Sequence, residues 1–126
     1  MERAGLILIA LLAACRAEQP ARVPGTGGPA ITVEVLNGTA RPGLARLGTR
    51  VLRAAGIDVV NVGTASSAAP LDSTRIVVRR GALTQGTSVR QALGVGAVSV
   101  ALDSTRLLDV SVFLGADFKP RLPFHP

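Results

Sequence analysis

The feature that most restricts the fold of this chain is a switch of hydrophobic period. Residues 31–37 (ITVEVLN) alternate between apolar and polar side chains, which is typical of a half-buried strand. After a turn at Asn37-Gly38-Thr39, residues 42–55 repeat their apolar side chains at helical spacing. Gly56 then follows, a residue that commonly ends a helix. A strand followed at once by an amphipathic helix predicts an α/β arrangement.

The rest of the chain predicts four more strands and one more helix. They are, in chain order, strands over 57–63 and 75–80, a short helix over about 87–93, and strands over 95–102 and 107–115. The order is β-α-β-β-α-β-β. We therefore expect one small mixed sheet with two helices packed on it, a two-layer α+β form of the α/β class. Only three residues are aromatic, so aliphatic side chains must fill the core.

One five-residue segment occurs twice. Residues 71–75 (LDSTR) recur as residues 102–106, and Asp, Ser and Thr in such segments favour turns. Two explanations are open: a duplicated helix-strand-turn-strand unit, or two similar turns that arose separately.

The N-terminus reads as an export signal. Residues 4–14 (AGLILIALLAA) form an apolar run that is too short to span a membrane, for which about 20 residues are needed. Arg3 precedes the run, and small residues and Cys15 end it, as in a secretory signal peptide. Residues 12–15 (LAAC) resemble the bacterial lipobox, which implies cleavage before Cys15 and lipidation of that residue. The expected location is the cell envelope, outside the cytoplasm.

The composition divides the chain into four segments. We expect a signal peptide over 1–14, a lipid-anchored flexible linker over 15–30 that holds three Pro and three Gly, an α/β domain over 31–118, and a Pro-rich tail over 119–126. A plain signal peptide with a chance cysteine is the alternative at the N-terminus.

Charge and residue inventory exclude several functions. The net charge is +6, but the chain has no Trp or Tyr and no basic run, so we expect no nucleic-acid partner. A structural zinc site needs about four Cys or His ligands, and the chain offers only Cys15 and His125, so no metal or other cofactor is expected. Because His125 lies in the Pro-flanked tail, a Ser-His-Asp site is not expected either, and we predict that the chain is not an enzyme.

Three groups of residues are candidates for ligand binding. The first is the turn Asn37-Gly38-Thr39 with Arg41, where free N–H groups before a helix favour an anion; a turn that only caps the helix is the alternative. The second is a stripe of arginines on one helix face, which suits phosphate or carboxylate; a solvated helix face is the alternative. Its members are Arg46, Arg50 and Arg53. The third is the strand 75–80, in which Arg75 and Arg79 share a face; a solvated face or a charged edge strand is the alternative.

Several segments together resemble the C-terminal accessory domain of the LytR/CpsA/Psr envelope proteins. The matching segments are residues 33–39 (VEVLNGT), 42–45 (PGLA), 52–59 (LRAAGIDV), 109–112 (DVSV) and 114–118 (LGADF). The resemblance implies an α/β domain at the bacterial cell envelope. It carries over no catalytic residues, because in that family the transfer of wall polymers belongs to a separate, larger domain.

These observations predict a non-catalytic envelope module. We expect it to be tethered to a membrane through Cys15 and to bind an anionic wall polymer or an envelope protein. The alternative is a structural subunit of an envelope complex that pairs through a strand or a helix face.

Overall fold

A computed structural model describes residues 30–66 and 69–120. The predicted signal peptide, Cys15, nearly all of the predicted linker and most of the predicted tail, including His125, lie outside the described residues. The elements are, in chain order, β1 (Thr32–Asn37), α2 (Leu44–Ala54), β2 (Asp58–Thr64), β3 (Arg75–Val78), α3 (Leu83–Leu93), β4 (Ala97–Val100) and β5 (Val110–Leu114). This confirms the predicted order and the class of fold.

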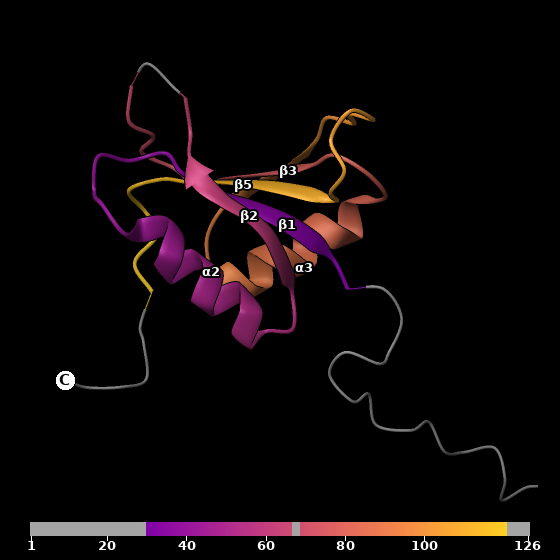
Figure 1. Ribbon diagram of the computed structural model, residues 1–126, viewed down its shortest axis with the longest axis horizontal. Coiled ribbons are helices and arrows are strands. Elements are labelled where there is room, and N and C mark those ends of the chain that lie inside the picture. The colour runs from indigo at the N-terminus through magenta and orange to yellow at the C-terminus, as the bar shows by residue number, and fades with distance from the viewer. Residues whose placement is uncertain (1–29, 67–68, 121–126) are drawn as a thin grey trace, which may run out of the picture.

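The strands form one mixed sheet in the order β2-β1-β5-β3-β4. β1 runs parallel to β2 and to β5, whereas β3 runs parallel to β4 and antiparallel to β5. Each parallel pair β1–β2 and β3–β4 is joined through a helix, as parallel neighbours require. Both helices lie on the same side of the sheet, so the domain has two layers (Figure 1).

The core lies between the sheet and the helices and is almost entirely aliphatic. Alternate residues of β1 and β5 point into it, and the side chains of Val33, Val35, Val110 and Val112 are fully buried. Phe118, after the last strand, is also fully buried. No helix in the described part of the chain has the length and apolar character to cross a membrane.

Several predicted boundaries are wrong. β4 spans Ala97–Val100 and not 95–102, and β5 begins at Val110 and not at residue 107. Helix α3 begins at Leu83 and not near residue 87. The apolar pattern missed its first turn because Gly86 stands there in place of a large apolar residue. A Cβ atom on Gly86 would lie 2.6 Å from Val98 and 2.8 Å from Val78, so the absence of a side chain lets the helix approach the sheet. Strand β3 stops at Val78, and Arg79 and Arg80 follow it.

The two copies of the repeated segment have different surroundings. In the first copy, Thr74 is fully buried and its hydroxyl donates to Asp117, and the chain enters β3 at once. In the second copy, the Thr105 hydroxyl donates to Asp103 of the same turn, and β5 begins only at Val110. These differences favour two similar turns over a duplicated unit.

Candidate functional site

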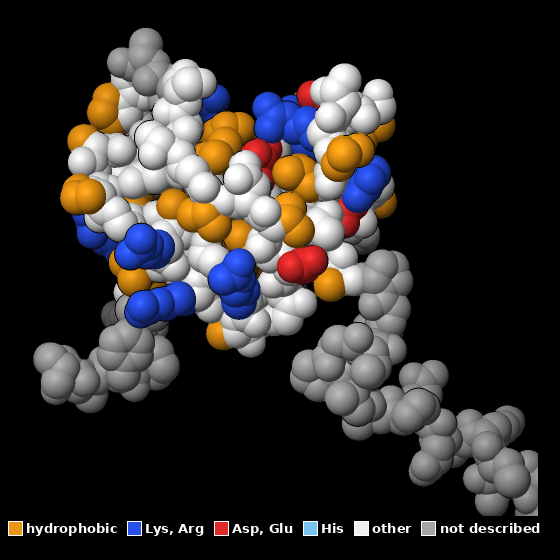
Figure 2. Space-filling model, viewed as in Figure 1, with side chains coloured by type: hydrophobic (Ala, Val, Ile, Leu, Met, Phe, Trp, Pro, Cys, Tyr) orange, Lys and Arg blue, Asp and Glu red, His pale blue; other side chains and the backbone are white. Residues whose placement is uncertain are grey.

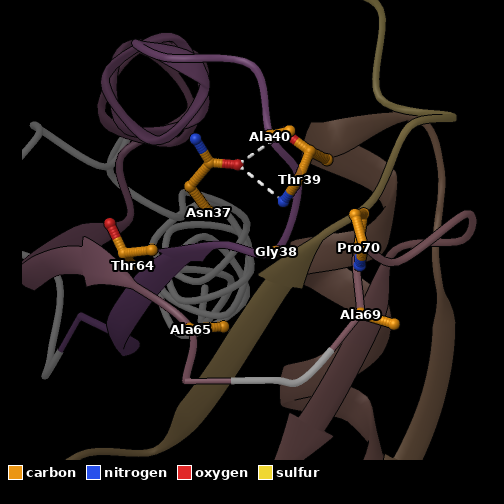
Figure 3. A pocket seen from close by; sticks show the side chains of 8 residues that line it. All are labelled: Asn37, Gly38, Thr39, Ala40, Thr64, Ala65, Ala69 and Pro70. Atoms are coloured by element: carbon orange, nitrogen blue, oxygen red, sulfur yellow. Dashed lines mark hydrogen bonds between the residues drawn. The ribbon is translucent and has the colours of Figure 1, made fainter.

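A pocket of about 190 Å³ lies where β1 and β2 end. Because these strands are parallel, their carboxyl ends meet at one edge of the sheet, the usual place for ligands in open α/β sheets. Figure 3 shows the side chains around the pocket, which are small or polar and carry no charge. The lining residues are Asn37, Gly38, Thr39, Ala40, Thr64, Ala65, Ala69 and Pro70.

The predicted turn Asn37-Gly38-Thr39 forms one wall of this pocket, and its polar groups bond to one another. The Asn37 carboxamide oxygen accepts from the Thr39 amide (2.9 Å) and the Thr39 hydroxyl (2.7 Å), and its nitrogen donates to the Arg41 carbonyl (2.7 Å). The Arg41 amide donates to the Thr39 hydroxyl at 3.1 Å. The amides of Thr39 and Arg41 are thus satisfied inside the turn, so an anion must be held by other groups.

Neither Asn37 nor Thr39 caps the following helix, which corrects one expectation. The residue before α2 is Gly43, at φ 84°, and no side chain caps the helix start. Gly38 is not needed for a left-handed backbone conformation, because it has no positive φ. A Cβ atom there would lie 2.7 Å from both the Leu114 carbonyl oxygen and Leu71. Gly38 is needed for close approach of the turn to β5, whose Leu114 carbonyl accepts its amide at 2.9 Å.

The predicted arginine stripe lies on the outside of α2. Arg46, Arg50 and Arg53 are all exposed, and Lys and Arg side chains gather over this helix in Figure 2. Arg53 donates to the Val59 carbonyl at 3.1 Å. Within residues 30–66 and 69–120, no acidic side chain forms an ion pair with any of the three. The stripe therefore presents uncompensated positive charge to the solvent.

Of the arginines in the predicted strand 75–80, Arg75 and Arg80 are exposed and Arg79 is half-buried. Strand β3 lies between β5 and β4, so the interpretation as a charged edge strand is wrong. Arg79 donates to the Ser111 hydroxyl at 3.1 Å, and Arg80 forms an ion pair with Asp109 at 3.0 Å. Two of the three thus have structural partners on β5 or just before it.

A partly buried ionic network, which the sequence analysis did not predict, lies on the face of the sheet away from the helices. Glu34 of β1 is 4% exposed, although its position in the alternation predicts an outward side chain. Its carboxylate accepts from the Ser111 hydroxyl and from Arg106, whose nitrogen lies 2.5 Å away. Arg106 comes from the β4–β5 connection, which lies across this part of the sheet, and it also pairs with Asp103 at 3.6 Å. The network fixes that connection to β1 and β5.

Two carboxylates in the same connection have lowered pKa values. Hydrogen bonds from the Thr105 hydroxyl and amide hold the pKa of Asp103 below its ordinary value. Partial burial would raise the pKa of Asp109, but hydrogen bonds from Thr32 and Arg80 outweigh it and lower that pKa. Both groups are therefore ionised at neutral pH and hold the connection in place.

Comparison with known proteins places the domain in a structural context. Residues 30–118 match the protein family LytR_C, described as "LytR cell envelope-related transcriptional attenuator". No curated protein matches the chain. Among solved structures, the soluble domain of a conserved hypothetical secreted protein from Mycobacterium marinum, an Rv2700 ortholog, has a TM-score of 0.51 at 21% identity over 71% of this chain and 61% of that one. The C-terminal domain of RV0431 gives a TM-score of 0.45 at 22% identity over 79% and 83%. The chain spans 61% of the Mycobacterium marinum domain, and that likeness shows a shared fold.

Proposed function

Since this chain belongs to the LytR_C family, whose description refers to the cell envelope, we propose that it is a non-catalytic module of the bacterial envelope. In this proposal the module is exported, tethered to a membrane through a lipid on Cys15, and binds an anionic wall polymer through helix α2. The observation that supports the binding role is the stripe of exposed arginines, with which no acidic side chain in the described part of the chain forms an ion pair.

The shape of the stripe favours a polymer over a small anion. Arg46 and Arg53 are seven residues apart, so their Cα atoms are separated by about 10 Å along the helix axis. A single phosphate or carboxylate reaches only one or two guanidinium groups across that distance. A linear polyanion contacts all three, and Arg suits bidentate contact with phosphate or carboxylate oxygens.

The pocket at the end of β1 and β2 lies on the same polymer path in this proposal. Arg41 follows the pocket turn and precedes α2, so it links the pocket to the stripe along the chain. The hydroxyls of Thr39 and Thr64 line an uncharged hollow. We assign it the sugar or polyol units of the polymer, whose hydroxyls need hydrogen bonds and no counter-charge.

The absence of catalysis is part of the proposal and is supported by the state of Ser111. This serine has a carboxylate, Glu34, as hydrogen-bond partner, but its side chain is fully buried. Its hydroxyl donates to Glu34 and accepts from Arg79, so its proton is committed to a structural bond. The pair holds the sheet face together, and a substrate cannot reach it.

Retention on purified cell-wall material tests the binding role. The variant Arg46→Gln/Arg50→Gln removes two charges from the stripe, and Arg75→Gln is a control that removes an exposed charge elsewhere. We expect retention of the wild-type chain at low salt, its loss at high salt because surface charges are screened, and a marked loss for the stripe variant alone. Equal retention of the stripe variant and the wild-type chain would sink the proposal.

Metabolic labelling with a fatty-acid probe tests the tether. The wild-type chain is expected to take up label and to fractionate with membranes, and Cys15→Ala is expected to do neither. Label on both chains, or on neither, contradicts lipidation at Cys15.

A second candidate role, assembly through an edge strand, rests on β2. This strand is the longest of the sheet with seven residues, lies at its edge, and contains no Lys, Arg or Pro to prevent pairing. Val60 and Val62 are 51% and 43% exposed. An extended segment of a protein partner could add to this edge.

Crosslinking in native membranes separates the two roles. Assembly predicts one dominant protein partner, which is lost in Val60→Lys and kept in Arg46→Gln/Arg50→Gln. Polymer binding predicts that retention on wall material is lost in Arg46→Gln/Arg50→Gln and kept in Val60→Lys.

A further inference from the structure

Exposed large apolar side chains are concentrated at one end of the domain. Among the described residues, six such side chains are exposed, and Val60 and Val62 belong to the β2 edge. The other four are Leu83 (53%), Val100 (49%), Leu102 (67%) and Leu107 (83%). We call these four residues the leucine end.

The strand register places the four residues at the same end of the sheet. Val33, Val110, Val78 and Val100 are successive partners across β1, β5, β3 and β4, and form one row. Beyond that row, β3 leads to Leu83 at the start of α3, β4 leads to Leu102, and Leu107 precedes β5. In Figure 1 this is the right-hand end, with the β4–β5 connection at the upper right.

The N-terminal part of the chain joins the domain at this same end. The row above contains Val33, the second residue of β1. The Thr32 carbonyl accepts from the Asp109 amide at 3.0 Å, two residues after Leu107. A membrane tether at Cys15, as in the proposed function, therefore attaches to the domain beside the leucine end, and the pocket lies at the opposite end of β1.

The connection that carries Leu102 and Leu107 is held firmly, so their exposure is a feature of the folded chain. The amides of Ala101 and Asp103 donate to the carbonyls of Val78 (2.9 Å) and Arg79 (3.0 Å). Arg106, next to Leu107, is fixed by Glu34 and Asp103. These contacts prevent the connection from folding its leucines inward.

Charge at this end is balanced, unlike the charge on α2. Arg80 pairs with Asp109, and Arg106 pairs with Glu34 and Asp103. The third nearby arginine, Arg79, donates to the Ser111 hydroxyl, which in turn donates to Glu34. Figure 2 shows hydrophobic, basic and acidic side chains together at this end. Such a surface has little net attraction for an anionic polymer. Its apolar side chains gain free energy when they leave water for an apolar phase.

We infer that the leucine end rests on the surface of a phospholipid bilayer, with Leu102 and Leu107 inserted among the acyl chains near the headgroups. The inference rests on the proposed tether, which brings this end to the membrane. The arginines and carboxylates stay at the level of the headgroups, and the pocket and the start of α2 point away from the membrane toward the wall. Since the charges cancel, the contact does not require anionic lipid.

A single tryptophan is a direct probe, because the chain contains no Trp or Tyr. The full chain carrying Leu107→Trp is reconstituted into phosphatidylcholine vesicles with and without brominated acyl chains. The matched control is Ser66→Trp, an exposed position after β2 at the opposite end. We expect the emission of the Leu107→Trp chain to shift to shorter wavelength and to be quenched by brominated lipid, and the control to show neither change. Similar emission from both chains would overturn the inference.

A second pair of variants tests the role of the neighbouring leucine. Adding Leu102→Ser to the Leu107→Trp chain is expected to reduce the quenching, whereas adding Val62→Ser, which alters an exposed apolar residue on β2, is not. Quenching is also expected to persist at high salt. If the Leu107→Trp emission does not shift in vesicles, the lipid contact is wrong.

The outcome is read separately from the proposed function. Mass spectrometry of Cys15 reports whether the chain is lipidated, and retention on wall material reports polymer binding. If the chain carries no lipid but still shows quenching specific to Leu107→Trp, the proposed tether is wrong and the membrane contact is supported. If the chain is lipidated but shows no quenching, the tether is supported and the membrane contact of the leucine end is wrong.

Discussion

Removing either partner of the Glu34–Arg106 pair should destabilise the domain, but by different amounts. Arg106→Ala leaves the Glu34 carboxylate, whose side chain is 5% exposed, without its cation. Breaking a fully buried pair in this way costs about 3–5 kcal/mol, and because the Arg106 side chain is 39% exposed we expect about 2–3 kcal/mol. Glu34→Gln keeps the size of the side chain and lets Arg106 turn to solvent, so about 1–2 kcal/mol is expected.

Urea unfolding of the two single variants and the double variant gives the coupling directly. The double variant no longer buries an unpaired carboxylate, so its loss should be smaller than the sum of the single losses by about 1 kcal/mol or more. Arg75→Ala, an exposed arginine on the same face of the sheet, is the control and should stay within about 0.5 kcal/mol of the wild-type chain. Additive losses, or equal losses for Arg106→Ala and Arg75→Ala, would refute the argument.

Three further predictions concern residues in the turns and connections of the domain. Gly38→Ala should lower the free energy of unfolding in urea by about 1–3 kcal/mol, because the added methyl group would lie 2.7 Å from a backbone oxygen. The control Gly63→Ala, whose methyl group would make one contact at 3.4 Å, should change that free energy by less than about 0.5 kcal/mol. Equal effects of the two variants would contradict the close approach of the turn to β5. The pKa of Asp109 is lower in the folded chain than in the unfolded chain, so the ionised carboxylate stabilises the fold near neutral pH and this stabilisation is lost as the pH falls through the folded pKa. Asp109→Asn should therefore lower Tm at pH 7, and the decline of Tm below about pH 4 should be less steep in this variant than in the wild-type chain. Parallel Tm curves for the two chains would argue against this. Thr74→Val should lower the free energy of unfolding by about 1–3 kcal/mol, because the buried Thr74 hydroxyl donates to Asp117 and accepts from the Gly115 amide. Thr87→Val, on the exposed side of α3, is the control. Similar unfolding midpoints for the two variants would show that the Thr74 bonds contribute little.

The local elements of this fold could be read from the sequence because each depends on a short-range pattern. The alternation in 31–37 and the helical spacing in 42–55 gave β1 and α2 within two residues of their ends. The start of α3 was missed because Gly86 takes the place of a core side chain, and this depends on its distance from Val78 and Val98. The position of β5 between β1 and β3 has no local signal in the sequence.

The site was predictable only in part, for the same reason. The turn Asn37-Gly38-Thr39 was found from its residue types, and the structure places it in the wall of a pocket. The other wall comes from residues around Thr64 and Pro70, which the sequence does not connect to the turn. The buried Glu34 was missed because the side chain that neutralises it, Arg106, lies 72 residues away along the chain.

The central claim, that α2 carries the binding surface for an anionic wall polymer, is tested most directly by titrating the isotope-labelled chain with purified polymer and following its amide NMR signals. The account predicts progressive shifts at Arg46, Arg50 and Arg53 and around the pocket turn, which are reversed by added salt. Shifts confined to β2 or to the leucine end, or an unchanged spectrum at low salt, would contradict it.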